Sequence, residues 1–376
     1  MRIMVLIEHF YPHIGGAERV TEHLLRGLVA RGHDACLVTN LTVEASAVQD
    51  WWEGVLVYRF PVIRALTGGD VRAIGRVAAQ LRALRARFHP DVVHVQFYGP
   101  IGVIHNMVNH TPRLPTVVEP HTDLTELTGG ALRRILDGAD VVVTLSEVME
   151  QDIATLAPAL LSRTRRIPYG IAVPPLAPAP LPFDPPVLLF FGRLVAKKGV
   201  DLALATLAQA RSRYPALRLL VAGDGPERAA LEAQAADLGI ADAVDFLGWI
   251  AAEEIPALIN RATVVLVPSR WEDPSPVVLR ETALMARPVI AAHVGGIPEL
   301  VVDGETGLLV PQEDVAAMTD ALFELLAQPD RTRRIGHAAR THALDAFERD
   351  RYVDSHLALY AELVAAAEPA RTWKAP

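Results

Sequence analysis

The chain alternates short apolar runs rich in β-branched residues with stretches whose apolar residues recur at the helical period. This alternation restricts the possible folds more than any other feature. In the first half the apolar runs occupy residues 2–8, 35–40, 92–97, 116–121 and 140–146. Because they are apolar at consecutive positions, both faces of each strand should be buried, as in parallel sheets covered by helices. The sequence therefore predicts an α/β fold of Rossmann-like, doubly wound parallel sheets.

A proline-rich segment divides this pattern into two halves. Residues 168–186 contain eight prolines, which neither a strand nor a helix interior tolerates, so we interpret them as a linker. The 376 residues also exceed the usual size of a single core. We predict domains at 1–167 and 187–345, with a C-terminal helix at 346–376 packing back toward the N-terminal domain. Ligands of such sheets bind at the carboxyl ends of the strands, here in a cleft that the two domains face.

Composition and charge argue against several classes of protein. The formal net charge of -8 disfavours nucleic-acid binding, which usually needs a basic face. No run approaches the roughly 18 apolar residues of a membrane span, and the first strand reaches Glu8 and His9 too early for a signal peptide. The single cysteine, Cys36, has no partner for an internal disulfide. These features together predict a cytoplasmic protein.

Glycine-rich and basic loops follow the predicted strands. Gly15 and Gly16 precede a helix, where backbone without side chains approaches a phosphate or sugar closely; a plain strand-to-helix turn is the simpler alternative. Arg193 and Lys198 flank a loop. Lysine is rare in this chain, since only three of the 36 basic residues are lysines, and this rarity favours a functional role for Lys198. Two fixed cations would stabilise the charge of a departing diphosphate, whereas a solvated basic loop is the structural alternative.

A third candidate is the helix start that follows the predicted strand at residues 263–269. Ser275 is a suitable N-cap and Pro276 a suitable first-turn residue, so we predict that a helix begins there. The amide groups from Val277 onward would then form an anion site facing the cleft.

Two carboxylates flank this helix start. Asp273 and Glu281 lie eight residues apart, and both would accept hydrogen bonds from the hydroxyl groups of one ligand. An ion-paired surface helix is the alternative, but it does not account for the GGIPE stretch at residues 295–299.

Residues at other strand ends add to the candidate site. Gly223 lies in a turn after a predicted strand, where a structural role outweighs ligand contact because the turn itself favours glycine. His121 and Asp123 follow the strand at 116–119, which places them at the rim of the predicted cleft as candidate functional residues. A structural role for the histidine is the alternative.

Several nucleotide-binding and metal-binding motifs are absent from the sequence. Arg228 stands where a third glycine would follow Gly223 and Gly225, so the chain lacks G-x-G-x-x-G, which disfavours a dinucleotide oxidoreductase. Walker A and D-x-D motifs are also missing. Because the histidines lack the spacing of metal ligands, we predict no metal and no bound cofactor.

These motifs, in this order and spacing, resemble the family-four retaining glycosyltransferases of the GT-B fold over essentially the whole chain. The resemblance implies that Arg193 and Lys198 bind the donor diphosphate, and that His121 contacts the transferred sugar. The implied catalytic residues are His121, Arg193, Lys198 and Asp273. The implied donor-binding residues are Gly15, Gly16, Arg193, Lys198, Gly223, Ser275, Pro276, Val277 and Glu281. The implied sugar or acceptor contacts are Glu18, His121 and Asp123.

Asp273 and Glu281 match a pair of acidic residues in this family. The resemblance implies that the first lies beside the transferred hexose and that the second binds the ribose hydroxyls. This sequence departs from the family pattern at three places. Asp273 replaces a glutamate, unless Glu272 serves with a one-residue shift. Ser275-Pro276 replaces Phe-Gly, and Arg280 stands where an apolar residue is common.

The resemblance implies transfer of a hexosyl group from a nucleotide-diphosphate sugar, with retention of configuration, to a saccharide or lipid-linked hydroxyl. The diphosphate would leave from the same face that the acceptor attacks, so no protein nucleophile is assigned. A nucleotide-sugar epimerase, a phosphorylase of the same architecture and a catalytically silent sugar-nucleotide binding module remain alternatives.

Residues 64–87 bear on the acceptor. This segment carries six arginines and one aspartate, with apolar residues at helical spacing. A basic amphipathic helix of this kind can rest on anionic lipid, which predicts peripheral contact with the inner face of a membrane. A solvated helix packed on the sheet is the alternative.

Overall fold

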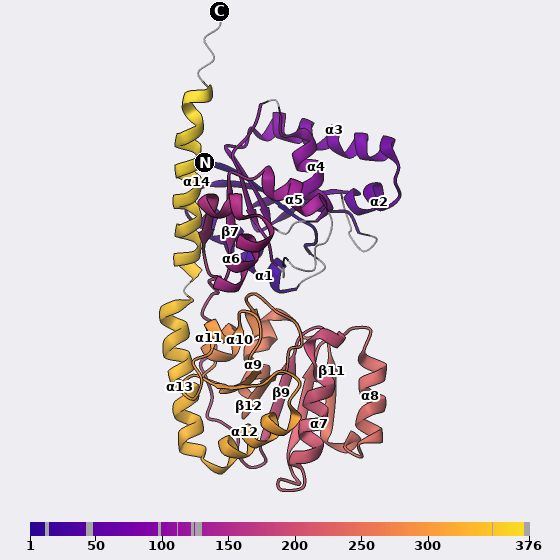
Figure 1. Ribbon diagram of the computed structural model, residues 1–376, viewed down its shortest axis with the longest axis vertical. Coiled ribbons are helices and arrows are strands. Elements are labelled where there is room, and N and C mark those ends of the chain that lie inside the picture. Colours follow the sequence, from indigo (N-terminus) through magenta and orange to yellow (C-terminus); the bar gives the residue numbers. More distant parts are fainter. Residues whose placement is uncertain are drawn as a thin grey trace, which may run out of the picture. The chain divides into compact units, whose positions relative to one another are not determined.

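The computed structural model describes residues 1–11, 15–42, 48–96, 99–110, 112–121, 124, 130–347 and 349–371. The chain forms two compact units. Unit 1 comprises Met1–Gly170 together with Arg349–Pro376, and unit 2 comprises Ile171–Glu348. Figure 1 colours the elements of both units along the sequence. Of the segment predicted as a linker, residues 171–186 therefore belong to unit 2.

Unit 1 is built on an eight-stranded sheet with the order β3-β4-β2-β1-β5-β6-β7-β8. Its strands are β1 (Arg2–Ile7), β2 (Asp34–Asn40), β3 (Gln49–Trp52), β4 (Val55–Phe60), β5 (Val92–Gln96), β6 (Thr116–Glu119), β7 (Val141–Thr144) and β8 (Thr164–Arg166). Every pairing is parallel except that of β3 with β4. The central strand β1 is almost completely buried from Ile3 to Ile7, as its uninterrupted apolar run predicts.

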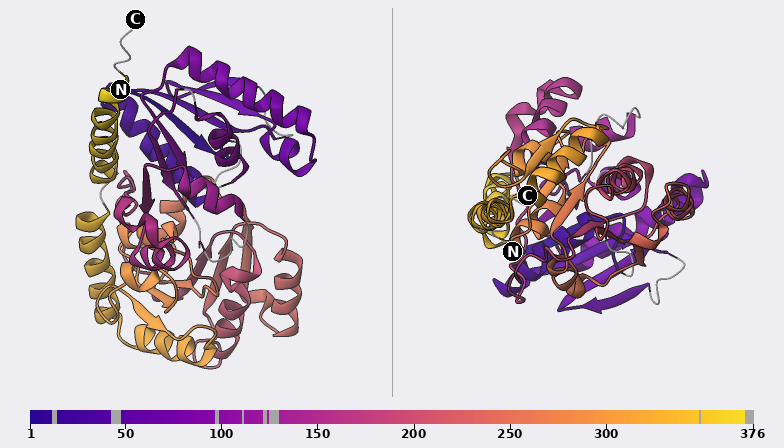
Figure 2. Two further views of the ribbon diagram at one scale, coloured as in Figure 1. Left: turned by 45° about the horizontal axis from the view of Figure 1, so that its top comes forward. Right: turned by 90° about the horizontal axis from the view of Figure 1, so that it is seen from below.

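The helices of unit 1 connect and cover this sheet. They are α1 (Gly16–Ala30), α2 (Val62–Thr67), α3 (Val71–Phe88), α4 (Pro100–Val108), α5 (Gly130–Asp137), α6 (Glu147–Leu156) and α14 (Arg349–Arg371), with a short 3-10 helix at Pro158–Arg163. The last helix, α14, packs against α1 and β5 and runs beside the rest of unit 1 in Figure 1 and in the left view of Figure 2. Residues after 348 thus complete the unit that residues 1–170 begin.

Unit 2 contains a six-stranded, wholly parallel sheet with the order β11-β10-β9-β12-β13-β14. Its strands are β9 (Val187–Phe191), β10 (Arg218–Ala222), β11 (Val244–Gly248), β12 (Val264–Val267), β13 (Val289–Ala292) and β14 (Leu308–Val310). Alternate residues enter two separate cores: Leu188 and Phe190 lie in one, whereas Leu189 and Phe191 lie in the other. Both faces of the sheet are therefore covered, which defines a doubly wound unit.

The helices of unit 2 are α7 (Val200–Ala210), α8 (Arg228–Asp237), α9 (Ile255–Asn260), α10 (Val277–Leu284), α11 (Ile297–Leu300), α12 (Val315–Ala327) and α13 (Pro329–Ala346). The proline-rich residues before β9 form neither helix nor extended strand. The Asn260 side chain anchors them, because it accepts a hydrogen bond from Ala179 N (2.9 Å) and donates one to Ala177 O (3.0 Å).

The parallel-sheet α/β architecture predicted from the sequence is confirmed in both units. The strands β3, β4 and β8 were not predicted. In the described part of the chain, no helix is both long enough and apolar enough to cross a bilayer.

The contact between α1 and α14 depends on a residue without a side chain. A Cβ atom at Gly27 would overlap the Cγ2 methyl of Val353, which is fully buried. We expect Gly27→Ala to lower the free energy of unfolding of unit 1 by about 1–3 kcal/mol through overpacking, measured by urea denaturation.

Gly75→Ala is the matched control, because Gly75 lies in α3 and a Cβ atom added there would have no neighbouring atom within 4 Å. This variant should be stabilised by roughly 0.5–1 kcal/mol through helix propensity. Equal stability of the two variants would contradict the packing argument.

Candidate functional site

Four loops at the carboxyl ends of the unit 2 strands form the main candidate site. They follow β9, β10, β12 and β13, and backbone hydrogen bonds join them. Leu194 N donates to Asp224 O (2.9 Å), Arg270 N donates to Lys197 O (2.9 Å), and Gly296 N donates to Asp273 O (2.9 Å). The loop after β9 therefore contacts those after β10 and β12, and the loop after β12 also contacts that after β13.

Two glycines allow this close approach. A Cβ atom at Gly223 would overlap the carbonyl oxygen of Gly192, and Gly223 also has a φ of +133°, which other residues rarely adopt. A Cβ atom at Gly296 would overlap the carbonyl oxygen of Pro274. Loop packing is thus sufficient to require glycine at 223 and at 296, whether or not either residue contacts a ligand.

The predicted cations and carboxylate occupy these loops. Lys198 Nζ lies 2.6 Å from Asp273 Oδ2, so the structure brings together two of the residues predicted to act at the site. The side chain of Arg193 is exposed, and it forms no ion pair or hydrogen bond with a described residue. Lys197, the residue before Lys198, lies over the Trp271 ring, with Nζ 3.6 Å from the ring centroid.

Asp273 rather than Glu272 is directed into the loop layer. Only 9% of Asp273 is exposed, and its Oδ1 accepts a hydrogen bond from Ser275 N (3.3 Å). Glu272 is exposed. Asp273 therefore holds the Lys198 ammonium group on one oxygen and organises the turn before α10 with the other.

The prediction that Ser275 caps α10 is wrong. The N-cap position is Pro276, the first helical residue is Val277, and no described side chain caps the helix. The Ser275 hydroxyl instead accepts a hydrogen bond from the Arg280 guanidinium (2.9 Å). Pro276 has no amide hydrogen, so the free amides of the helix start begin at Val277.

Arg280 has a structural role that the sequence did not reveal. It is completely buried, and its guanidinium reaches back from α10 to Ser275 and to the carbonyl oxygen of Pro276 (3.4 Å). The same group lies 4.6 Å from the centroid of the Phe347 ring. Arg280 therefore fixes the turn that leads into α10. Glu281, the next residue, is partly exposed on the same helix.

In unit 1, the glycine-rich stretch begins α1. Gly15 occupies the N-cap position, Gly16 is the first helical residue, and the Glu18 carboxylate accepts a hydrogen bond from Gly15 N (2.7 Å). Glu18, predicted as an acceptor contact, thus serves as a capping residue in this structure. Asp123 lies outside the described residues.

His121 directly follows β6 and Pro120. Burial lowers the pKa of His121 to about 4, although the nearby Glu119 carboxylate opposes this shift. The ring is therefore neutral near pH 7. Its Nδ1 is hydrogen-bonded to the Tyr169 hydroxyl, whereas its Nε2 is shielded from solvent and has no hydrogen-bond partner among the described residues.

A buried polar cluster beside His121 was missed by sequence analysis. His94 Nε2 and His356 Nε2 lie 3.1 and 2.9 Å from Glu119 Oε2, and the Tyr352 hydroxyl donates to Glu119 Oε1 (3.0 Å). Burial alone would raise the pKa of Glu119, but the two histidines hold it well below its ordinary value. These residues come from β5, β6 and α14, so no local spacing in the sequence links them.

The same cluster is the set of described residues that fits a metal ion. The three ligand atoms of His94, Glu119 and His356 lie within 4.8 Å of one another. The 2.9 Å separation of His356 Nε2 from Glu119 Oε2 is, however, that of a direct hydrogen bond, and His94 Nε2 lies at ion-pair distance, 3.1 Å, from the same oxygen. Direct contact between the histidines and the carboxylate therefore accounts for the observed geometry.

Comparison with known proteins identifies the family. Residues 177–342 match the family described as Glycosyl transferases group 1, and residues 14–173 match Glycosyltransferase Family 4. The D-inositol 3-phosphate glycosyltransferase of Acidothermus cellulolyticus is 32% identical over 406 residues, which cover 95% of this chain and 88% of that protein. The chain belongs to the group 1 glycosyltransferases.

Other similar proteins agree with this assignment. A GDP-mannose-dependent alpha-(1-6)-phosphatidylinositol monomannoside mannosyltransferase of Mycolicibacterium smegmatis is 35% identical over 235 residues, which cover 58% of this chain and 61% of that protein. Sucrose-phosphate synthase from Thermosynechococcus elongatus has a TM-score of 0.85 at 23% identity, covering 97% of this chain and 99% of that one. Anabaena HepE in complex with UDP-glucose has a TM-score of 0.78 at 20% identity, covering 97% of this chain and 100% of that one. The solved structures establish the GT-B fold, and the comparisons do not favour the epimerase, phosphorylase or binding-module alternatives.

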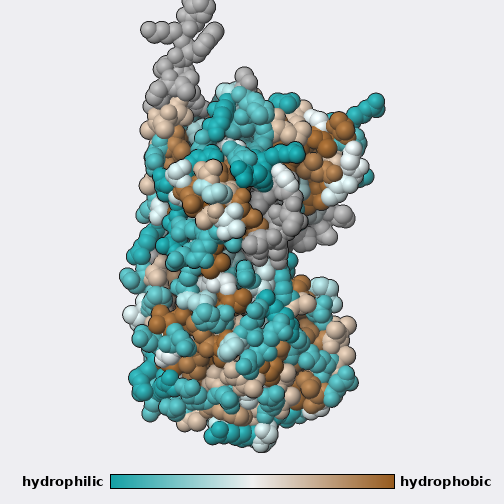
Figure 3. All heavy atoms as spheres, in the orientation of Figure 1, coloured by the Kyte–Doolittle hydropathy of each residue, from teal (hydrophilic) through white to brown (hydrophobic). Residues whose placement is uncertain are grey.

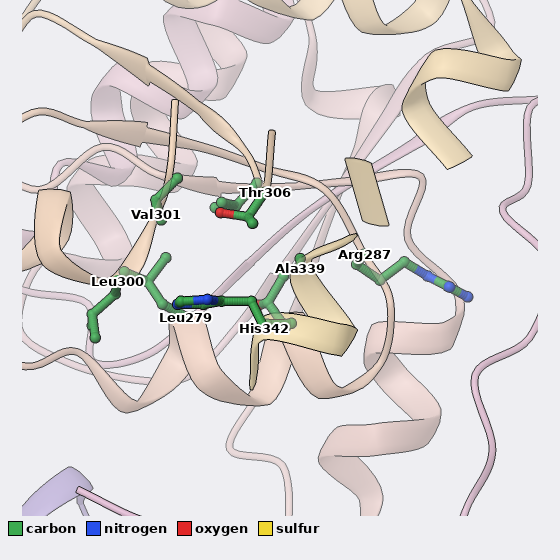
Figure 4. Close-up of a pocket in the computed structure, with 10 residues that line it drawn as sticks. Leu279, Arg287, Leu300, Val301, Thr306, Ala339 and His342 are labelled. Carbon is green, nitrogen blue, oxygen red and sulfur yellow. The ribbon is translucent and has the colours of Figure 1, made fainter. Parts of the chain in front are cut away.

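A small hollow in this glycosyltransferase lies away from the candidate site. Its lining includes Leu279, Val289, Ala339 and His342. Val289 is the first residue of β13, so the hollow lies at the amino end of that strand, opposite the loop layer. In Figure 4 the Arg287 guanidinium extends away from the other labelled side chains. Arg287 instead donates hydrogen bonds to Ile259 O (3.1 Å) and Asn260 O (2.9 Å).

The role of Arg280 can be tested by Arg280→Lys. Lysine keeps the charge but loses the planar guanidinium that both stacks on Phe347 and donates to Ser275. We expect the free energy of unfolding of unit 2 to fall by about 2 kcal/mol or more, measured by chemical denaturation. Arg261→Lys is the control: Arg261 is exposed, and its replacement should change stability by less than about 0.5 kcal/mol. Similar small effects at both positions would refute the proposed role of Arg280.

Proposed function

We propose that this glycosyltransferase moves a hexosyl group from a nucleotide-diphosphate sugar to an acceptor hydroxyl with retention of configuration. The observation that carries the proposal is the Lys198–Asp273 pair, which lies within the loop layer directly before α10. Among the similar proteins, the Mycolicibacterium smegmatis enzyme is named as GDP-mannose-dependent, and HepE was solved with UDP-glucose. Both names support a nucleotide-sugar donor.

In the proposed reaction, unit 2 binds the nucleotide. Arg193 and Lys198 bind the diphosphate, and the amide of Val277 adds the positive end of the α10 dipole. Glu281 accepts hydrogen bonds from the ribose hydroxyls. Asp273 orients Lys198 and lies beside the transferred hexose. Gly223, Ser275 and Pro276 supply backbone at the donor site, while Ser275 keeps its hydrogen bond to Arg280.

Unit 1 is proposed to contact the sugar and the acceptor. His121 contacts the transferred hexose, and Gly15 and Gly16 approach the donor phosphate or the acceptor. Asp123 is kept in the proposal as an acceptor contact from the sequence. Glu18 contributes by fixing Gly15 at the start of α1, since its carboxylate accepts the Gly15 amide hydrogen.

The chemical step is a front-face displacement. The bond between the anomeric carbon and the diphosphate oxygen breaks, and the acceptor oxygen forms a bond to that carbon from the same face. The acceptor proton passes to the departing phosphate oxygen. We propose that no metal takes part, because the cations at 193 and 198 and the helix start supply positive charge for the leaving group.

The acceptor is proposed to be a saccharide or a lipid-linked hydroxyl, reached from the membrane surface. Arg64, Arg72, Arg76 and Arg82 are exposed on α2 and α3, and hydrophilic and hydrophobic side chains both appear on the surface where these helices lie (Figure 3). The structure corrects one part of this prediction. Arg85 is buried and donates to Val108 O (2.7 Å), so it is inaccessible to lipid.

Most of the apolar side of the same segment is already covered. Val77, Leu81 and Leu84 are buried, whereas Val71 at the start of α3 is exposed, and α3 packs against α2 and α4. Contact with a bilayer would therefore rest mainly on the charge of the exposed arginines rather than on insertion of a wide apolar face.

Turnover of a panel of UDP-, GDP- and ADP-hexoses tests the proposed reaction. One donor should release nucleoside diphosphate, faster with acceptor present, and proton NMR of the product should show the anomeric configuration of the donor. Lys198→Ala should lower kcat by roughly 10²–10³-fold, as expected for loss of electrostatic stabilisation of the leaving group.

Lys197→Ala is the matched control, because it removes the neighbouring lysine. It should change kcat by less than about tenfold, the factor that corresponds to roughly 1.4 kcal/mol. Inversion of configuration would refute the front-face step. Equal effects of the two lysine variants would refute the role given to Lys198.

Vesicle sedimentation tests the proposed membrane contact. The double variant Arg72→Glu and Arg82→Glu should bind phosphatidylglycerol vesicles at least about tenfold more weakly than the unaltered protein, since each basic residue contributes about 1 kcal/mol near an anionic surface. The variant Arg261→Glu and Arg334→Glu makes the same charge change on exposed positions of unit 2 and should bind normally. Equal losses in both variants would show that only net charge matters.

A further inference from the structure

The contact between His121 and Tyr169 is the one hydrogen bond that the candidate catalytic histidine forms with a described side chain. The Tyr169 hydroxyl is hydrogen-bonded to His121 Nδ1, and the two rings stack with centroids 5.4 Å apart at an angle of 21°. Tyr169 is buried and is the residue before Gly170, with which the first stretch of unit 1 ends.

Tyr169 is itself held by the buried cluster. Its ring meets the edge of Tyr352, with centroids 6.1 Å apart, and the Tyr352 hydroxyl donates to Glu119. Glu119 stands two residues before His121 at the end of β6. His121, Tyr169, Tyr352 and Glu119 are therefore linked by a continuous series of contacts that joins three separate parts of unit 1.

The direction of the hydrogen bond follows from acidity. A neutral imidazole N–H is a much weaker acid than a phenol, whose pKa is about 10, so the hydroxyl donates and Nδ1 accepts. In a neutral histidine the single proton must then reside on Nε2. That atom is shielded from solvent without a described partner, a costly arrangement that a ligand oxygen would relieve.

We propose that Tyr169 is a positioning residue for His121, holding the ring as its Nε2–H tautomer so that this N–H donates to an oxygen atom of the transferred sugar. The inference rests on the proposed function only for the identity of the ligand. The tautomer and its dependence on Tyr169 are properties of the unliganded protein.

The tautomer is tested by long-range ¹H–¹⁵N correlation spectra of protein labelled with ¹⁵N-histidine, with the His121 signals assigned by their loss in His121→Ala. The intact protein should show a protonated Nε2 and an unprotonated Nδ1. Tyr169→Phe should convert this pattern to a mixture of tautomers. A protonated Nδ1 in the intact protein, or an unchanged pattern in Tyr169→Phe, would overturn the proposal.

Kinetics supply the second readout. Tyr169→Phe should lower kcat about tenfold, the effect expected of one hydrogen bond, with the KM for the donor unchanged. In the His121→Ala background the same substitution should have no further effect. Additive losses would show that Tyr169 acts independently of His121 and would overturn the positioning role.

Tyr360→Phe is the matched control. The Tyr360 hydroxyl makes an analogous contact with His94 Nδ1 (2.6 Å), and this pair does not include His121. The control should alter the His94 signals and lower the melting temperature, but leave kcat within about twofold of the intact protein, a difference below 0.5 kcal/mol. If no donor gives turnover, the proposed function fails while the spectra still decide the role of Tyr169.

Discussion

The backbone contacts among the loops after β9, β10, β12 and β13 are the constraint on which the donor site of unit 2 depends. Parallel strands bring these loops to one edge of the sheet, but only close contact turns them into a rigid layer. Hydrogen bonds such as Gly296 N to Asp273 O join the loops, and Gly223 leaves room for the neighbouring chain. The Lys198–Asp273 pair then links side chains across the same layer, so charge and backbone geometry are fixed together.

Much of this architecture could be predicted because it depends on local patterns. The buried strands β1 and β9 are continuous apolar runs, and the residues after them were correctly expected at strand ends. The antiparallel strand β3 was not predicted, because its four residues are mostly exposed and form no apolar run. The N-cap of α10 was predicted wrongly because the Ser275 hydroxyl accepts a hydrogen bond from Arg280 instead of capping the helix. Residue preferences for the N-cap position do not reveal a guanidinium that approaches from the following turn.

The buried cluster in unit 1 illustrates a second limit of sequence analysis. His94, Glu119 and His356 are far apart in the sequence, and each alone resembles an ordinary core residue. Together they satisfy a carboxylate that would be costly to bury by itself. Of this cluster, Glu119 stands two residues before His121, and the Tyr352 hydroxyl that donates to Glu119 belongs to the ring in contact with Tyr169. Such an arrangement becomes visible only when the three elements are placed in space.

The placement of α14 has a consequence for how the protein is made. The Met1–Gly170 part of unit 1 needs Arg349–Arg371 to cover α1 and β5, and these residues leave the ribosome after unit 2. All of unit 2 is synthesised in the interval. During that time Glu119 lacks both the Tyr352 hydroxyl and the His356 ring that satisfy it in the finished molecule. Unit 1 therefore starts to emerge before unit 2 but is completed after it, and its final packing waits until α14 has been synthesised.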